Sequence, residues 1–301
     1  MNMARVGWIG WGCCAIALLL AAAAQAGDEA GLRVGSFNIR FGSAADGEDR
    51  WEVRRARVVR TMEELNLDVW GLQEAEAFQV RELLAALPRY AAIGVGREDG
   101  RLKGEACPIL VDRARFAIVE SGVFWLSDRP FEPGSITWDN ACTRLCTWAR
   151  LIDWRSGRGC TVYNVHLDHV GQDSRLRAAT QIRAHFAALA ERTGGGDPLL
   201  VVGDFNAAED NPAMETLRGA AGDKLTLRDT YRVLHAGGAA GTFTGFDVKS
   251  DGGDRKIDYV WIGPGWKVRQ AEIDRRKIDG RYPSDHFAVW AEVGWGGVNG
   301  E

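Results

Sequence analysis

Short runs of β-forming residues are spread evenly over the whole chain, and this spread limits the fold more than any other feature. Two stretches between them, 51–65 and 173–192, repeat apolar residues at helical spacing. We therefore expect a two-layer sheet core flanked by helices, in one domain of about 270 residues. Length alone leaves two smaller domains open. The strand-like runs are 32–39, 67–73, 107–112, 115–125, 143–154, 160–167, 198–203, 257–262, 266–274 and 286–293.

The composition excludes several protein classes. Apolar residues make up 46% and charged residues 26% of the 301 residues, which rules out a disordered chain, a collagen and a polytopic membrane protein. The formal net charge is −4, and removal of residues 1–26, whose only charged side chain is Arg5, makes it −5. An acidic protein does not coat nucleic acid by charge alone. Any phosphate group would have to be bound in a local basic or metal-bearing cleft.

The first 26 residues have the pattern of a secretory signal peptide. Arg5 precedes an apolar run over 6–24, and Ala24-Gln25-Ala26 is a small-x-small cleavage site. We expect cleavage after Ala26, a mature single domain over 27–301, and a periplasmic or secreted protein without membrane contact. An uncleaved anchor stays open, because 19 apolar residues barely span a bilayer.

Four cysteines remain after the signal peptide: Cys107, Cys142, Cys146 and Cys160. An oxidising compartment would permit disulfides among them. Buried free thiols are an equally good interpretation, because cysteine is among the most buried residue types. The sequence leaves the disulfide state open.

Polar side chains stand at the ends of several strand-like runs. Each one alone is more often a turn former or a solvated strand end. Together they would converge at one sheet edge, where carboxylates repel each other unless a cation lies among them. Oxygen ligands from Glu, Asp and Asn suit Mg²⁺. These residues are Asn38, Glu74, His166, Asp204, Asn206, Asp258, Asp285 and His286.

Six motifs in this order resemble the endonuclease/exonuclease/phosphatase superfamily, which has the pancreatic-deoxyribonuclease-like fold. The resemblance spans Ser36–Val289 and implies an α/β fold: a four-layer α/β sandwich of two mixed β-sheets packed face to face and flanked by helices. It also implies hydrolysis of a phosphate ester. Segments 99–108, 125–127, 138–150 and 281–286 look more like a secreted or periplasmic bacterial branch. The motifs are SFNIR (36–40), GLQE (71–74), NVHLDH (164–169), GDFNA (203–207), IDYVW (257–261) and SDHFAV (284–289).

The resemblance implies a metal site. Glu74 should bind the metal directly, with Asn38 beside it and Asp285 next to the metal region. The expected cofactor is Mg²⁺, for which Mn²⁺ could substitute. The metal would stabilise charge on a phosphate oxygen and on the leaving oxygen.

It also implies roles for the polar groups around the phosphate. Asp204 should align or deprotonate the attacking water, which Asn206 should orient. His286, paired with Asp258, should donate to the phosphate or act as the base. Which group is the general base stays open. Two further phosphate ligands are expected, namely His166 and, as a bidentate contact, Arg144.

The substrate is the least constrained prediction. Rim loops at 99–105, 138–140 and 241–246 are rich in Gly, Asp and aromatic residues, which suits a compact polar ligand. A small phosphomono- or phosphodiester is therefore favoured over long nucleic acid, and a monomer is expected. A secreted nuclease remains the alternative, and an inactive binding module is less favoured because the motif set is complete. The arginine cluster Arg54, Arg55, Arg57 and Arg60 is interpreted as a solvated helix face.

Overall fold

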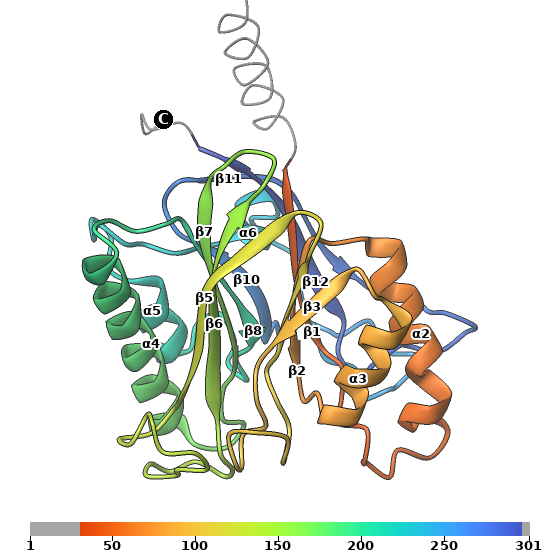
Figure 1. The fold of residues 1–301 in the computed structure, drawn as a ribbon. Helices are drawn as coiled ribbons and strands as arrows, with labels where there is room; N and C mark the ends of the chain where they lie inside the picture. Colours follow the sequence, from red (N-terminus) through yellow and green to blue (C-terminus); the bar gives the residue numbers. More distant parts are fainter. Residues whose placement is uncertain (1–30, 297–301) are drawn as a thin grey trace, which may run out of the picture.

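The computed structural model describes residues 31–296, which form two mixed β-sheets of six strands each (Figure 1). The first sheet has the order β11-β12-β1-β2-β4-β3 and the second β5-β6-β7-β8-β10-β9. The strands of the first are β1 (Leu32–Asn38), β2 (Val69–Gln73), β3 (Tyr90–Ile93), β4 (Ile109–Asp112), β11 (Trp266–Asp274) and β12 (Ala288–Trp295). Those of the second are β5 (Phe116–Trp125), β6 (Leu145–Asp153), β7 (Gly159–His166), β8 (Leu199–Asp204), β9 (Arg228–Asp229) and β10 (Asp258–Ile262).

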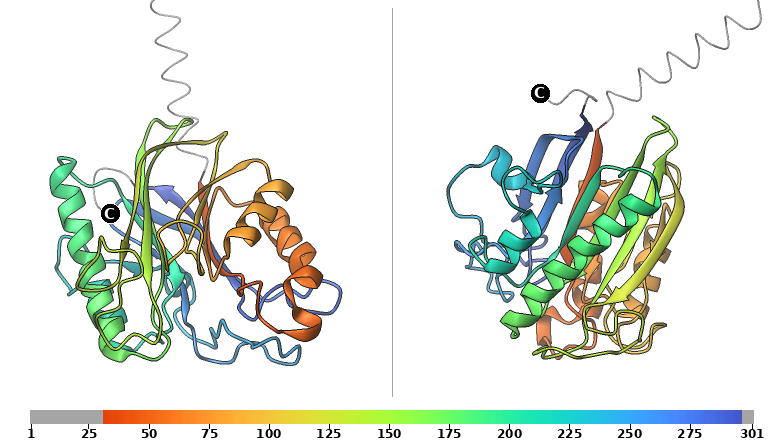
Figure 2. Two further views of the ribbon diagram at one scale, coloured as in Figure 1. Left: turned by 60° about the horizontal axis from the view of Figure 1, so that its bottom comes forward. Right: turned by 90° about the vertical axis from the view of Figure 1, so that its left-hand side faces the viewer.

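Helices cover the outer face of each sheet, which gives the predicted four layers (Figure 2). Apolar residues of α2 and α3 pack on the first sheet, and those of α4 and α5 pack on the second. The short helix α6 contacts β10 and β11. The helices are α2 (Trp51–Leu65), α3 (Ala77–Ala86), α4 (Gln172–Arg192), α5 (Pro212–Arg218) and α6 (Thr230–Leu234), with a 3₁₀ turn at Gly47–Asp49.

The main core lies between the two sheets. Val34 and Val69 of the first sheet and Val162 and Val202 of the second belong to one cluster of fully buried side chains. Both faces of these strands are buried. This explains why their sequences are continuous apolar runs rather than alternating apolar and polar residues. β1 runs parallel to β2, and β7 runs parallel to β8. The carboxyl ends of all four strands therefore reach the same edge of the sandwich.

All ten predicted strand-like runs form strands, shifted by no more than two residues at either end. Two further strands were not predicted: β3, which is four residues long, and the two-residue β9. Both are short, so they carry no period that a sequence pattern can reveal. Among the described residues, the four cysteines are free thiols; Cys142 is half-buried and the other three are buried.

The interpretation of the α2 arginines as a solvated face is wrong for two of them. Arg54 and Arg57 are buried, whereas Arg55 and Arg60 face solvent. The guanidinium of Arg54 donates to the carbonyls of Ile39 and Arg40, which belong to the loop after β1. Burial is tolerated because backbone carbonyls replace the water that the guanidinium loses.

The predicted signal peptide, 1–26, lies outside the described residues. Within 31–296, no helix is both long enough and apolar enough to cross a membrane.

A buried polar network joins the two sheets beneath the edge where the parallel strands end. Gln73 of β2 donates to the side-chain oxygen of Asn164 in β7 at 2.7 Å and to Ser36 of β1 at 3.1 Å. Asn164 donates in turn to the carbonyls of Leu72 at 2.8 Å and Pro108 at 2.9 Å. These bonds fix how the end of the first sheet lies against the end of the second.

Asn164→Ala should lower the free energy of unfolding by about 3 kcal/mol, because it removes three buried hydrogen bonds, those with Gln73 and with the carbonyls of Leu72 and Pro108. Chemical denaturation followed by circular dichroism measures the change. Gln270→Ala, at an exposed position of β11, is the control and should change stability by less than about 0.5 kcal/mol. Equal effects of the two substitutions would show that the network does not hold the sheets together.

Candidate active site

The predicted site residues meet where β1, β2, β7 and β8 end. Strand register accounts for this, because Asn38 pairs with Gln73 in the first sheet and His166 pairs with Asp204 in the second. The antiparallel neighbour β10 begins opposite Asp204 and so contributes Asp258. The segment before β12 supplies the remaining two residues, Asp285 and His286.

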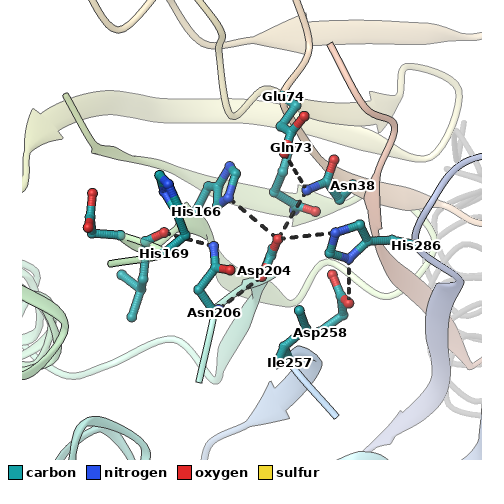
Figure 3. A network of polar contacts seen from close by, with 12 residues as sticks. Asn38, Gln73, Glu74, His166, His169, Asp204, Asn206, Ile257, Asp258 and His286 are labelled. Carbon is teal, nitrogen blue, oxygen red and sulfur yellow. Dashed lines mark hydrogen bonds and ion pairs between the residues drawn. The ribbon is translucent and has the colours of Figure 1, made fainter. Parts of the chain in front are cut away.

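The carboxylate of Asp204 lies at the centre of the group (Figure 3). Its Oδ2 accepts a hydrogen bond from Nδ2 of Asn38 at 3.0 Å. The Nε2 atoms of His166 and His286 lie 3.4 Å and 3.7 Å from the same oxygen. Its Oδ1 accepts from the backbone N–H of Asn206 at 2.9 Å. Residues from both sheets therefore converge on one buried carboxylate.

His286 and Asp258 form the predicted pair. Nδ1 of His286 lies 2.9 Å from Oδ2 of Asp258, and both side chains are buried. This contact fixes the imidazole ring and directs its Nε2 toward Asp204. The other oxygen of Asp258 is buried without a hydrogen-bond partner within residues 31–296.

Burial sets the charge states of the central groups. Burial, with the nearby charge of Asp258, raises the pKa of Asp204 to about 7. For His286, burial opposes protonation, but Asp258 and Asp204 outweigh it and raise the pKa well above its ordinary value. Burial and the charge of Arg144 lower the pKa of His166 well below its ordinary value. The two histidines therefore differ: His286 favours the charged form and His166 the neutral form.

Glu74 and Asp285, the predicted metal ligands, flank the guanidinium of Arg40. Its Nη1 lies 3.8 Å from Glu74 and its Nε lies 3.9 Å from Asp285, so neither carboxylate has a short ion pair with it. Burial raises the pKa of Asp285, and the charge of Glu74 raises it further. Two carboxylates that repel each other, and whose ion pairs with Arg40 are long, fit a hard divalent metal ion.

Asn38 is placed between the candidate metal ligand and the central carboxylate. Its Nδ2 donates to Glu74 at 3.1 Å as well as to Asp204, and its Oδ1 accepts from the backbone N–H of Arg40 at 3.0 Å. A carbonyl oxygen has a second lone pair, so this atom remains chemically suited to a metal. A second group of possible ligands also includes Glu74: one atom each of Glu74, Glu105 and His166 lies within 4.8 Å of the others.

The backbone at the site is strained at three non-glycine residues. Arg40, Glu74 and Asn206 have φ values of 55°, 58° and 48°, in the left-handed region that side chains disfavour. Each follows a strand that ends at the site, so the chain turns sharply and leaves the side chain beside the central carboxylate. Such strain persists where surrounding contacts hold it.

Arg144 is buried at the site, with 4% of its side chain exposed. Nη2 contacts Nδ1 of His169 at 3.1 Å, and Nε lies 3.7 Å from Asp168. Its Nε and Nη1 are buried and have no hydrogen-bond partner among the described residues. Unpaired buried N–H groups are costly, which marks this guanidinium as a site for an anion.

A cavity of about 320 Å³ opens onto the group. Asn38 and Asp258 lie behind its wall and act through Asp204 and His286. Four further polar residues line the cavity: Arg40, Arg97, Glu105 and His169. Arg40 and His169 lie in identified motifs and Glu105 lies in a predicted rim loop, whereas Arg97 lies two residues before that loop and was not predicted. The predicted residues in the lining are Glu74, Arg144, His166, Asp204, Asn206, Asp285 and His286.

The rim loops differ in how they meet the cavity. Phe243 lines it, is 47% exposed and packs edge-on against His286 with ring centroids 4.9 Å apart. Trp138 instead packs against the core and donates to Asp128 at 2.8 Å, so it holds its own loop. Lys103 lies outside the lining and pairs with Glu98 at 3.0 Å.

The sequence profile described as "Endonuclease/Exonuclease/phosphatase family" matches residues 35–286. The chain belongs to this family. Its members are hydrolases that act on phosphate esters, the enzyme class predicted from the motifs, and they generally use divalent metals. The match covers all eight of the polar strand-end residues from Asn38 to His286.

Similar proteins of known structure share the whole architecture. The mannosyl-6-phosphatase of Bacteroides thetaiotaomicron is 30% identical, and the match covers 87% of this chain and 99% of that one with a TM-score of 0.78. A family protein of Bacteroides vulgatus is 31% identical over 89% of this chain and 100% of that one, with a TM-score of 0.81.

One relative was found by sequence similarity. Nocturnin of Drosophila melanogaster is 24% identical over 85% of this chain, and the match covers only 44% of the length of Nocturnin.

The geometry of the His286–Asp258 pair predicts unequal effects on phosphate-ester hydrolysis. His286→Ala should lower kcat by about 10²–10⁴-fold, the usual contribution of an acid–base group. Asp258→Asn should lower kcat by a smaller factor, because Asp258 acts by holding the His286 ring. Steady-state kinetics measures both, and circular dichroism checks that each variant folds. A neutral Asp258→Asn beside a severe His286→Ala would contradict the pairing.

Proposed function

We propose that this protein is a divalent-metal-dependent phosphoesterase that hydrolyses a small phosphate ester by in-line attack of water. One observation carries the proposal: the buried guanidinium of Arg144 leaves Nε and Nη1 unpaired beside a cavity that also contains Asp204. Buried guanidinium N–H groups without partners favour an anion, and a phosphoryl oxygen is such an acceptor. The same cavity then offers an acceptor for the proton of the attacking water.

In this mechanism the phosphoryl group lies between Arg144, His166 and His286. Arg144 donates through its unpaired Nε and Nη1 atoms, and the two histidines donate through their ring N–H groups. Asp258 keeps the His286 ring oriented through Nδ1, so that Nε2 stays available to the substrate. All three ligands are buried, so a phosphate bound there exchanges water for fixed donors, which suits stabilisation of developing charge.

The attacking water is oriented by the pair that follows β8. Asp204 holds Asn206 through its backbone N–H, and the side chain of Asn206 donates to the carbonyl of Leu167 at 3.1 Å. This arrangement leaves the amide oxygen of Asn206 free to accept from water. Asp204 aligns the water or takes its proton. The competing candidate for the base, His286, would have to act from its neutral form, which its raised pKa disfavours.

Glu74 and Asp285 would hold the metal ion, with Asn38 beside them, and Mg²⁺ is the cation that this oxygen donor set suits best. When bound, it stabilises negative charge on a phosphate oxygen and on the leaving oxygen. Arg40 keeps the two carboxylates near each other, because it lies within 4 Å of both. Mn²⁺ should substitute for Mg²⁺.

Several features favour a small substrate. The cavity of about 320 Å³ is at the small end of the range for ligand pockets. Its lining has four acidic side chains against three arginines, so it forms no basic track for a long polyanion. The similarity to a mannosyl-6-phosphatase supports the same direction. A nuclease is the second candidate, because the exposed ring of Phe243 at the cavity could stack on a base.

The ester preference can be measured directly. With Mg²⁺ at physiological salt, kcat/KM for p-nitrophenyl phosphate, bis(p-nitrophenyl) phosphate or a sugar phosphate should exceed that for plasmid DNA or RNA. The physical reason is that only a compact ester reaches Arg144 inside the cavity. Far more efficient cleavage of nucleic acid than of every small ester would replace this proposal with the nuclease.

The same assay tests the metal. Dialysis against a chelator should abolish turnover, and Mg²⁺ or Mn²⁺ should restore it. Glu74→Gln keeps the size of the side chain but removes one charge, so it should raise the Mg²⁺ concentration needed for half-maximal activity. Full activity after exhaustive chelation would exclude the metal.

We further propose that the protein is exported and acts in the periplasm or outside the cell. The support is the pattern of Arg5, the apolar run and Ala24-Gln25-Ala26. N-terminal sequencing of protein recovered from its host should begin at Gly27. A chain that begins at Met1 would contradict cleavage.

A further inference from the structure

Arg54 of α2 is fully buried outside the cavity lining, and its guanidinium binds two backbone segments that lead into the site. Nη1 and Nη2 donate to the carbonyls of Ile39 and Arg40, in the loop after β1. Nη1 also donates, at 3.4 Å, to the carbonyl of Pro283, two residues before Asp285. One side chain therefore joins the loop after β1 to the segment before β12.

The loop after β1 holds the other proposed metal ligand, Glu74. The backbone N–H of Phe41, next to Arg40, donates to Oε2 of Glu74 at 3.1 Å. Nδ2 of Asn38, at the end of β1, donates to Oε1 of the same carboxylate at 3.1 Å. Arg54 thus binds the backbone beside the donors to Glu74 and beside Asp285, although it contacts neither carboxylate directly.

Strand pairing does not reach these contacts. β1 and β12 pair as antiparallel strands as far as Ser36 and Val289. Beyond that register, side chains connect the two segments: Oγ of Ser284 donates to the carbonyl of Asn38 at 2.7 Å, and Arg54 makes the bonds given above. Loss of Arg54 would therefore loosen the two segments relative to each other where the sheet no longer holds them.

The guanidinium of Arg54 is itself held in place. Its central carbon lies 5.1 Å from the ring centroid of Trp51 and 5.7 Å from that of Phe246. Phe246 belongs to a rim loop in which the backbone N–H of Thr244 donates to the carbonyl of Asp285 at 2.7 Å. Burial lowers the pKa of Arg54 to about 10, so the group still carries its charge at neutral pH. Arg54 is therefore a fixed, charged donor behind the site.

We propose that Arg54 is a positioning residue that sets the affinity of the metal site by holding the loop after β1 against the segment that carries Asp285. The inference rests on the proposed function, which assigns the metal ion to Glu74 and Asp285. Groups behind the ligands of a metal orient those ligands, and their loss usually costs about 10–100-fold in metal affinity. Arg54 has this effect through backbone carbonyls rather than through the carboxylates.

Three substitutions on α2 separate positioning from a general loss of stability. Arg54→Met keeps an unbranched side chain but removes every donor. Arg54→Lys keeps a cation but lacks the planar fork, and it also serves as the second variant if Arg54→Met does not fold. Arg57→Met is the matched control, because Arg57 is also buried on α2, while its Nη2 lies 3.6 Å from Asp49 and outside the cavity lining.

Mn²⁺ is the probe, and electron paramagnetic resonance of the free ion measures its binding in the absence of any substrate. The dissociation constant should rise by about tenfold or more in Arg54→Met and by a smaller factor in Arg54→Lys. Arg57→Met should change it by less than about twofold, although it too removes a buried cation. Chemical denaturation gives the stability of each variant, and the change in Mn²⁺ affinity should not follow the change in stability.

Asp285→Asn, which removes a proposed ligand, assigns the Mn²⁺ signal to the site and should weaken the binding strongly. If it bound Mn²⁺ as tightly as the unsubstituted protein, the proposed metal site would fail, and the role of Arg54 with it. Unchanged or tighter Mn²⁺ binding in both Arg54 variants, beside weak binding in Asp285→Asn, would overturn the inference about Arg54 alone. Equal weakening in Arg54→Met and Arg57→Met would also overturn it, because loss of stability would then account for both.

Discussion

The hydrogen bond from Asn38 to Asp204 joins the two sheets at the point where the chemistry is proposed to occur. Asn38 ends a strand of the first sheet and Asp204 ends a strand of the second, and their side chains meet at 3.0 Å. Beneath them, Gln73 and Asn164 repeat the same kind of contact at 2.7 Å. The site exists only while the sheets keep this alignment, because each sheet alone carries only part of the polar set.

The site combines buried carboxylates with buried cations, and the two kinds of group lie in different parts of the cavity. Asp204 lies among donors, whereas Glu74 and Asp285 flank Arg40 in long ion pairs. Elsewhere in the lining, Nε and Nη1 of Arg144 have no hydrogen-bond partner within the described chain. A phosphate ester between these two regions would meet fixed charges of the sign it needs, without reorganisation of water.

Most of the fold and of the candidate site could be predicted because the signals were local. Asn38 and Asp204 directly follow apolar runs in the sequence, and parallel pairing brings the ends of such runs together. Burial of Arg54 could not be predicted, because its partners are the carbonyls of Ile39 and Arg40 and, at 3.4 Å, that of Pro283, which is 229 residues away. His169 was also missed, because a neighbouring histidine in the same motif carried the stronger signal.

Most strands, the family and the polar residues at the strand ends could be predicted from the sequence, since these depend on periodicity and on motifs a few residues long. Tertiary contacts decide which of those side chains share a cavity, which are buried behind it, and which atoms of Arg144 have no partner among the described residues. The physical reason is that burial and pairing depend on contacts between both sheets. Residues more than 100 positions apart, such as Asn38 and Asp204, set each other's environment.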